Sequence, residues 1–217
     1  LPLFNFMYQL PILVSSLFIG LGVSLVLTYK IVLLISFILS GVFMFWFIYE
    51  LLHDKNKAFF VALFYQFAPF RFVELLIRGA IGGIYTYAFL PFVLVGLTKL
   101  IKQQSIPSFI LTVFATALLI LSHNSLSMVF VGISVLYLLL FSQNKQSFFC
   151  GLTAIGTGLA LASFYWIPAI AEHKYTYGDL FMKNLYQTHF PPIQNFFIPN
   201  VIRYNDFLNV AWIFCHT

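Results

Sequence analysis

The stretch IVLLISFILSGVFMFWFIYELL, residues 31–52, decides the fold class. It runs for 22 residues with one charged side chain, Glu50. An α-helix needs roughly 20 apolar residues to cross the hydrocarbon core of a bilayer. The whole chain of 217 residues agrees with this stretch: 61% of it is hydrophobic and only 8% charged, whereas soluble domains carry about a quarter charged residues. We therefore predict an all-α integral membrane protein, a bundle of about six to seven transmembrane helices.

Further apolar elements lie on both sides of this stretch. We predict them at residues 11–27, 58–70, 79–97, 109–121, 126–141 and 148–171. The first is barely long enough to span, with Lys30 in a tight turn after it, and it could instead lie in the external interface. The element at 58–70 should continue as a helix into the charged residues that follow, and Pro91 should kink the element at 79–97.

The predicted domains follow from these elements. Residues 1–171 form the multi-spanning domain, incomplete at its N-terminus, because the chain starts at Leu1 without a signal peptide. Residues 172–209 form a long external loop or the start of a small external subdomain. Residues 210–217 begin a further apolar element, so we expect the chain to be an internal piece of a longer protein.

Lysine residues in three short loops predict the orientation. If the spans alternate, the loops at 53–57, 99–105 and 142–147 share one side, which short lysine-bearing loops place in the cytoplasm. The protein is then a multi-pass protein of the cell (plasma) membrane. The opposite, external face gathers the unusual polar residues Arg71, Glu74, Arg78, His123, Asn124, Glu172 and His173.

Three charges fall within eight residues of the segment APFRFVELLIRGA, residues 68–80. In a helix Arg71, Glu74 and Arg78 would share one face, and Glu74 could bridge both guanidinium groups. The remaining guanidinium donors suit phosphate oxygens, which at a membrane belong to lipid headgroups or lipid-linked phosphates. The plainer interpretation is an interfacial ion network that anchors a helix end.

Two other polar positions interrupt apolar elements. His123 is either a structural residue at a helix end, or a proton acceptor or hydrogen-bond donor to a sugar or phosphate. Glu172 ends the last predicted span and is the best carboxylate for acid–base or metal work, although any helix end meeting water can carry a glutamate. The aromatic residues of the tail could stack on sugar rings or belong to an interfacial belt.

Other sequence patterns concern helix packing and the motifs that the sequence lacks. The spacing of Gly79 and Gly83, and that of Ala154, Gly158 and Ala162, predicts close helix packing. The sequence has no glycine-rich phosphate loop, HExxH or CxxC motif, and its basic residues form no stripe that would predict a nucleic-acid partner. It names no cofactor and leaves a divalent metal open.

Several stretches together resemble a known family. LFNFMYQLP, YQFAPFRFVELLIRGAIGG, LSHNSLSM and FYWIPAIAEHKY resemble bacterial and archaeal multi-spanning proteins known as the 6-pyruvoyl-tetrahydropterin-synthase-related membrane domain. The architecture is similar to that of GT-C type glycosyltransferases, which take a sugar from a polyprenyl-phosphate donor on the external face. The resemblance extends to about Tyr177.

The resemblance implies roles for individual residues. Tyr8 and Pro11 match an external juxtamembrane helix, which favours the interfacial position of residues 11–27. Arg71 and Arg78 match arginines of the external loop where a donor phosphate would bind. Gly83 stands where a glutamate is expected, and the usual acidic base of such enzymes would precede Leu1.

These arguments predict a glycosyltransferase-like membrane protein with a polyprenyl-phosphate lipid as partner, an unknown sugar acceptor and surrounding membrane lipids. The predicted site residues are His123 and Glu172 as catalytic residues, Arg71 and Arg78 as phosphate ligands, Glu74 and Asn124 as orienting residues, and Tyr8 and Tyr175 as stacking residues, with no metal ligand. The alternatives are a non-enzymatic transporter or assembly subunit for lipid-linked or polymeric glycans, and a structural anchor without a ligand.

Overall fold

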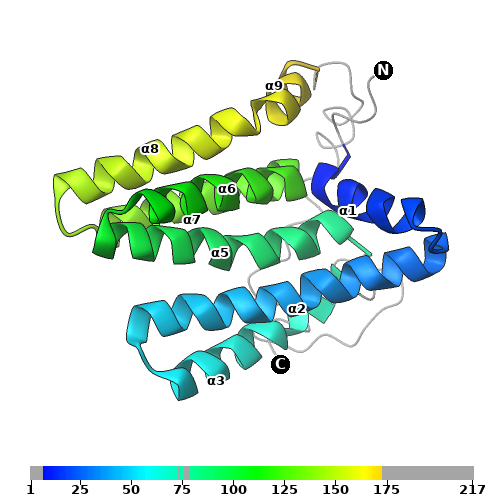
Figure 1. Cartoon of the computed structure of the whole chain (residues 1–217), viewed down its shortest axis with the longest axis horizontal. Coiled ribbons are helices and arrows are strands. Elements are labelled where there is room, and N and C mark those ends of the chain that lie inside the picture. Colours follow the sequence, from blue (N-terminus) through cyan, green and yellow to red (C-terminus); the bar gives the residue numbers. More distant parts are fainter. Residues whose placement is uncertain (1–6, 73, 76–78, 173–217) are drawn as a thin grey trace, which may run out of the picture.

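The computed structural model describes residues 7–72, 74–75 and 79–172, and within them it contains helices and no β-strand. The predicted all-α class is therefore confirmed (Figure 1). The α-helices are α1 (Gln9–Gly20), α2 (Leu25–Leu52), α3 (Lys55–Gln66), α4 (Pro69–Phe72), α5 (Ile81–Gln103), α6 (Ile106–Ser122), α7 (Asn124–Phe141), α8 (Lys145–Leu161) and α9 (Ser163–Glu172).

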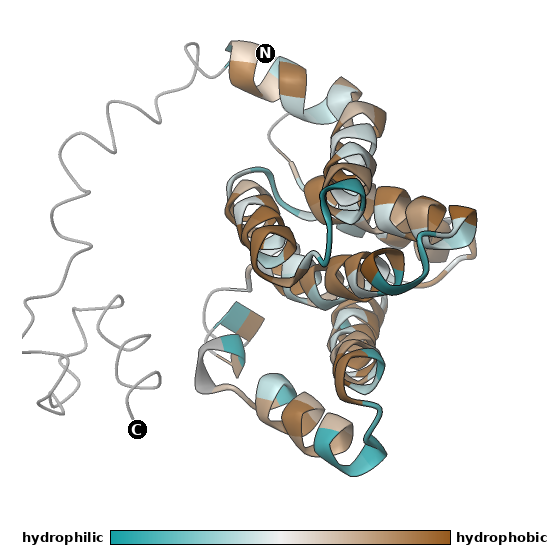
Figure 2. Ribbon diagram, turned by 90° about the vertical axis from the view of Figure 1, so that its left-hand side faces the viewer, coloured by the Kyte–Doolittle hydropathy of each residue, from teal (hydrophilic) through white to brown (hydrophobic). Residues whose placement is uncertain are grey.

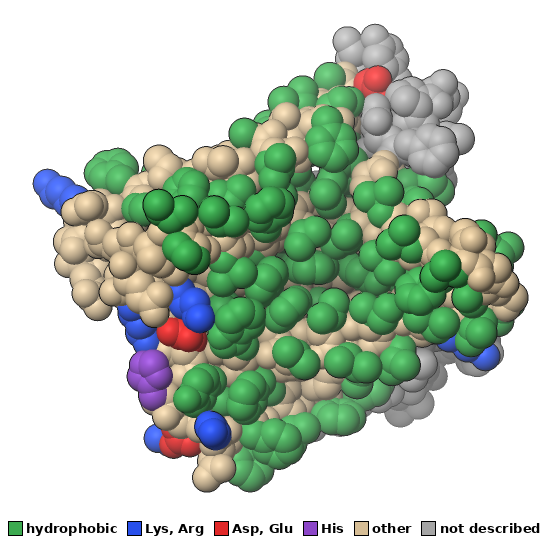
Figure 3. Space-filling view, in the orientation of Figure 1, with side chains coloured by type: hydrophobic (Ala, Val, Ile, Leu, Met, Phe, Trp, Pro, Cys, Tyr) green, Lys and Arg blue, Asp and Glu red, His purple; other side chains and the backbone are tan. Residues whose placement is uncertain are grey.

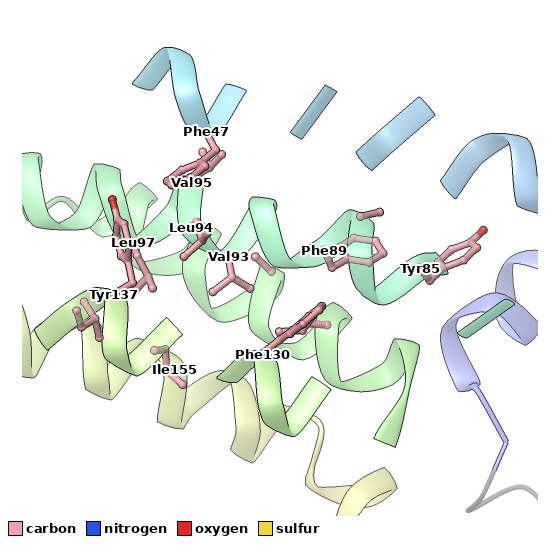
Figure 4. Close-up of a cluster of buried hydrophobic side chains, with 14 of the residues drawn as sticks. Phe47, Tyr85, Phe89, Val93, Leu94, Val95, Leu97, Phe130, Tyr137 and Ile155 are labelled. Atoms are coloured by element: carbon pink, nitrogen blue, oxygen red, sulfur yellow. The ribbon is translucent and has the colours of Figure 1, made fainter. Parts of the chain in front are cut away.

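Helix α5 forms the centre of the bundle. It packs against α2 on one side and against α6, α7 and α8 on the other (Figure 1). The buried side chains of Val93, Val95 and Leu97 on α5 meet Phe47 from α2 and Ile155 from α8 (Figure 4). Helix α5 is thus the most buried of the candidate spans, and its first turn contributes to the candidate site.

Three helices are long and apolar enough to cross a membrane: α2, α5 and α7. Helices α8 and α9 meet at an angle of 70° and make a fourth span if they are counted together. Helices α1, α3 and α6 have 12, 12 and 17 residues, which is short for a full crossing. The predicted six to seven spans are therefore not confirmed in the described part of the chain, although the long apolar helices agree with a membrane protein.

Several predicted boundaries were wrong, each for a local reason. The first helix ends at Gly20, and the turn contains Gly22 in the left-handed region, with φ of +83°, so Lys30 lies inside α2 instead of in the turn. Helix α3 stops at Gln66 and does not continue unbroken into the charged segment, because Pro69 disfavours helical backbone at Ala68. The span predicted at 148–171 is bent where α8 ends and α9 begins.

The lysine-bearing loops lie together at one end of the bundle. The ammonium group of Lys102 donates to the backbone carbonyl of Glu50, and that of Lys99 lies 3.7 Å from the Glu50 carboxylate. These contacts join the end of α5 to the last turn of α2, and the α7–α8 turn lies at the same end of the bundle (Figure 1). Figure 3 shows charged and histidine side chains gathered there, beside a broad hydrophobic surface. The hydropathy colouring in Figure 2 likewise changes from brown along the helices to teal at the turns.

The predicted small-residue contact is confirmed in α8 and wrong near α5. A Cβ atom added to Gly158 would lie 2.6 Å from Thr116 Cβ and 2.7 Å from the carbonyl oxygen of Val113, so α8 touches the α6 backbone there. Gly79 instead precedes α5 in a left-handed conformation, and Gly83 faces the carboxylate of Glu74. The Gly79–Gly83 spacing therefore serves a turn and a side-chain contact, because Gly79 is not part of the helix.

Two glycines of α8 give a matched test of this packing. Gly158→Ala places a methyl group against α6, whereas Gly156→Ala places it in open space. Both changes gain the same helix propensity, so we expect Gly158→Ala to be less stable than Gly156→Ala by about 1–3 kcal/mol. Thermal unfolding of the two purified proteins in the same detergent measures the difference, and equal unfolding temperatures would contradict the α6–α8 contact.

Candidate functional site

A single extended residue, His123, separates α6 from α7. Its backbone has φ of −164° and ψ of 128°, which ends one helix and begins the next. Its Nδ1 atom accepts a hydrogen bond from the backbone N–H of Leu126 at 3.4 Å, so the ring caps α7. With Nδ1 as acceptor, the neutral imidazole carries its proton on Nε2 and acts as a donor there. Of the roles predicted for His123, the geometry shows the structural one at a helix end, and its role toward a sugar or phosphate stays a prediction.

The segment before α1 packs onto this helix break. The ring of Tyr8 stacks on the ring of His123, with 4.7 Å between centroids and 30° between planes. The adjacent residue, Met7, accepts a hydrogen bond through its backbone carbonyl from the Tyr165 hydroxyl of α9, at 2.8 Å. Three segments far apart in sequence therefore meet here, at the end of α5 away from the lysine-bearing loops. Tyr8, predicted to stack on a sugar, stacks on an imidazole ring.

The first turn of α5 lies between this break and a buried carboxylate. A Cβ atom at Gly82 would meet the Tyr8 ring and would lie 2.7 Å from the backbone oxygen of Ser122. A Cβ atom at Gly83 would lie 2.8 Å from Glu74 Oε2, and Glu74 is only 4% exposed. The two glycines thus let the histidine break and the carboxylate approach adjacent residues of one helix. Glu74 occupies the space beside Gly83, where the resemblance had led us to expect a glutamate side chain.

Arg71 lies elsewhere, deep between α2 and α3. Its Nη1 donates to Ser40 Oγ at 2.5 Å and to Gln66 Oε1 at 3.1 Å. The guanidinium carbon lies 5.7 Å from the centre of the Phe37 ring and 5.2 Å from that of Tyr65, which are cation–π distances. The side chain is 5% exposed, and its Nη2 is buried without a hydrogen-bond partner.

This position differs from the one predicted at the external face. Ser40 lies about 22 Å along α2 from Leu25 and about 18 Å from Leu52, at 1.5 Å per residue. The guanidinium group is therefore near the middle of a candidate span. The reason is that α3 has only 12 residues, so the chain turns at Pro69 before it reaches the far end of α2.

The remaining predicted site residues lie either at helix ends or outside the described residues. Asn124 is the first residue of α7 and Glu172 the last of α9, and both are half-buried. Arg78 and Tyr175 lie outside the described residues, as do the predicted loop from 173 to 209 and the apolar element at 210–217. Within the described ranges no group of three or more His, Cys, Asp or Glu side chains could hold a metal ion.

Sequence reasoning missed the residues that hold Arg71. Ser40 and Gln66 are polar residues inside apolar stretches, and this was the available signal. Gln66 Oε1 accepts from Ser40 Oγ at 2.6 Å, and Gln66 Nε2 donates to the backbone oxygen of Phe37 at 2.6 Å. Tyr65 extends the cluster to α5 by donating to the carbonyl of Tyr87 at 2.6 Å. Together these bonds connect α2, α3, α4 and α5 through one buried polar cluster.

Two serines of α2 test the importance of this cluster. Ser36 and Ser40 are both fully buried and both donate to a carbonyl three residues earlier, but only Ser40 also contacts Gln66 and Arg71. We expect Ser40→Ala to lower the free energy of unfolding by about 1.5–3 kcal/mol, the usual value for a hydrogen bond to a charged group. Ser36→Ala should change it by much less. Chemical denaturation in mixed micelles measures both, and a Ser36→Ala loss as large as that of Ser40→Ala would contradict the cluster's role.

Comparison with known proteins adds one match. A model for a family described as "6-pyruvoyl-tetrahydropterin synthase related domain; membrane protein" matches residues 4–216. Neither a curated protein nor a solved structure gives a significant match.

Proposed function

The chain belongs to the 6-pyruvoyl-tetrahydropterin synthase related family of membrane proteins, and we propose that this member transfers a sugar from a polyprenyl-phosphate donor on the external face. The observation that carries the proposal is that the His123–Tyr8 stack and the buried carboxylate of Glu74 lie beside adjacent residues of α5, Gly82 and Gly83. It lies at the end of the bundle away from the lysine-bearing loops. A hydrogen-bond donor, a carboxylate and an aromatic ring beside apolar helices suit a sugar attached to a lipid.

The donor phosphate is assigned to Arg78, with Arg71 as a second ligand that the phosphate reaches only within the bundle, since the Arg71 guanidinium group lies near the middle of α2. Arg71 supports this assignment because its buried Nη2 has no partner, and a phosphate oxygen would supply one. Its positive charge also acts in a low-dielectric environment, where an anion is attracted more strongly than in water. Arg78 follows the Glu74 segment and provides a guanidinium group for the same phosphate.

The reaction is a displacement at the anomeric carbon of the sugar. The bond from this carbon to the phosphate oxygen breaks, a bond to the acceptor hydroxyl oxygen forms, and polyprenyl phosphate leaves. The acceptor's proton passes to the carboxylate of Glu172, while His123 donates from Nε2 to a sugar or phosphate oxygen. Glu74 and Asn124 orient the groups around the reacting sugar, and Tyr175 stacks on the acceptor sugar.

The phosphate role of Arg78 has a direct test. Membranes containing the full-length protein are incubated with a polyprenyl phosphate carrying a radiolabelled hexose, and labelled glycan products are counted. We expect Arg78→Ala to lower the transfer rate at least tenfold, because one charge-assisted bond to the phosphate is lost. The matched control is Lys30→Ala, which removes an exposed cation of α2. Transfer by Arg78→Ala at the wild-type rate would refute the assignment.

Substitutions of His123 separate its capping role from its role toward the substrate. His123→Asn keeps a good helix cap for α7 but removes the imidazole donor, whereas His123→Ala removes both. We expect both variants to lose transfer activity, and only His123→Ala to unfold at a lower temperature. Activity that survives in His123→Asn would show that the residue is needed for structure alone.

A second candidate function is a non-enzymatic transporter or assembly subunit for lipid-linked glycans. The position of Arg71 halfway along α2 favours it, because a cation inside a span is typical of a path for an anionic headgroup. Proteoliposomes distinguish the two functions. A transporter moves the labelled carrier between leaflets without forming a new glycosidic bond, whereas a transferase forms the bond.

A further inference from the structure

A groove lies on the surface between α2 and α3, and its inner end borders the polar cluster that holds Arg71. Its cavity measures about 260 Å³. Six apolar residues line it, namely Gly41, Val42 and Phe45 of α2 and Phe59, Ala62 and Leu63 of α3, and Gln66 is the seventh lining residue. Val42 and Phe59 are 51% and 54% exposed, so the groove opens outward.

The inner end of the groove is closed by Gln66, which approaches α2 closely at Gly41. Gly41 has no side chain there, and an added Cβ atom would lie 3.4 Å from Gln66 Oε1. Gln66 itself is fixed by its hydrogen bonds to Ser40, Arg71 and the Phe37 carbonyl. The groove therefore ends at the buried polar cluster.

The depth of the groove matches one leaflet of a bilayer. Along α3 it extends from Phe59 to Gln66, roughly 6 to 17 Å from Lys55 at the α2–α3 turn. Along α2 it reaches Gly41, about 17 Å from Leu52. Half of the hydrocarbon core is about 15 Å thick. An apolar chain that enters from the lysine-bearing end would thus reach the groove's inner end near the bilayer midplane.

The shallow end of the groove leads to positive charge. Lys55 and Lys57 begin α3 about one turn before Phe59, and both are exposed. Lys57 lies 3.3 Å from Asp54, the N-terminal cap of α3, so these two lysines and this acid carry a net charge of +1. Lysines close to a membrane surface attract anionic lipid headgroups.

We propose that this groove binds one acyl chain of an anionic phospholipid from the leaflet on the lysine-bearing side, with the headgroup at Lys55 and Lys57. The site matches both parts of such a lipid. The acyl chain would lie against apolar walls, and the phosphate would lie beside ammonium groups. The chain gains no hydrophobic transfer energy, since it is already in the membrane. Its gain is the van der Waals contact that an unfilled groove would lack. The groove borders the Arg71 cluster at its inner end, but the binding of a phospholipid there does not require sugar transfer and stands if that proposal fails.

Crosslinking in nanodiscs tests the proposal. The full chain is placed in nanodiscs that contain either phosphatidylglycerol or phosphatidylcholine with the same diazirine-labelled acyl chain, and labelled peptides are mapped by mass spectrometry. We expect phosphatidylglycerol to label residues 59–66 more strongly than phosphatidylcholine. Gly41→Leu, which fills the groove, should abolish this labelling, whereas Gly132→Leu, at an exposed glycine of α7 with open space around it, should leave it unchanged.

A second variant keeps the groove and removes the charge, in case Gly41→Leu does not fold. Replacing Lys55 and Lys57 by glutamine should reduce the preference for phosphatidylglycerol by about fivefold for each lysine. Equal labelling of wild type and Gly41→Leu, an unchanged preference in the double glutamine variant, or labelling spread equally over α7 would each overturn the proposal. Stronger labelling of the same peptides by a polyprenyl phosphate would overturn the choice of occupant. None of these results depends on sugar transfer.

Discussion

The fold depends on one constraint: inside a bilayer every backbone polar group must find its partner within the protein. Helices α2 and α7 meet this constraint with their own backbone bonds, whereas in α5 Pro91 leaves the Tyr87 carbonyl without its helical donor and the Tyr65 hydroxyl of α3 donates to it instead. Three buried hydroxyl groups follow the same rule: Thr86, Thr98 and Ser134 each donate to a carbonyl four residues earlier in their own helix. Helices satisfied in this way can pack closely, as α6 and α8 do at Gly158.

Polar side chains of the candidate sites lie where the helices are interrupted, between α6 and α7 and before Pro69. The α6–α7 break leaves backbone donors at the start of α7, and the His123 ring accepts from one of them. The break before Pro69 returns Arg71 toward the middle of α2, where Ser40 and Gln66 bind it. A guanidinium group is costly at that depth, so it needs hydrogen bonds and aromatic rings around it. Each break therefore creates a polar site that a continuous helix would not have.

The bundle has two chemically different ends. One end carries lysine side chains joined to Glu50 and leads into the apolar groove between α2 and α3. The other end carries the His123–Tyr8 stack and the Glu74 carboxylate beside the first turn of α5. A lipid-bound role at the first end and sugar chemistry at the second are compatible, because the lysines at the mouth of the groove and the His123–Tyr8 stack lie at opposite ends of the bundle.

The sequence by itself determined the helical class, the approximate position of most helices and the grouping of the lysine-bearing loops, because long apolar runs and short charged turns follow from local composition. It also marked His123 and Glu74 as unusual. Only the tertiary structure decided that Tyr8 stacks on His123, that Glu74 lies against Gly83, and that Arg71 turns inward to Ser40. These contacts join residues 115, 9 and 31 positions apart, and they depend on how α1, α3 and α5 pack. Periodicity and spacing describe only neighbours along the chain, so a contact between helices could not be obtained from them.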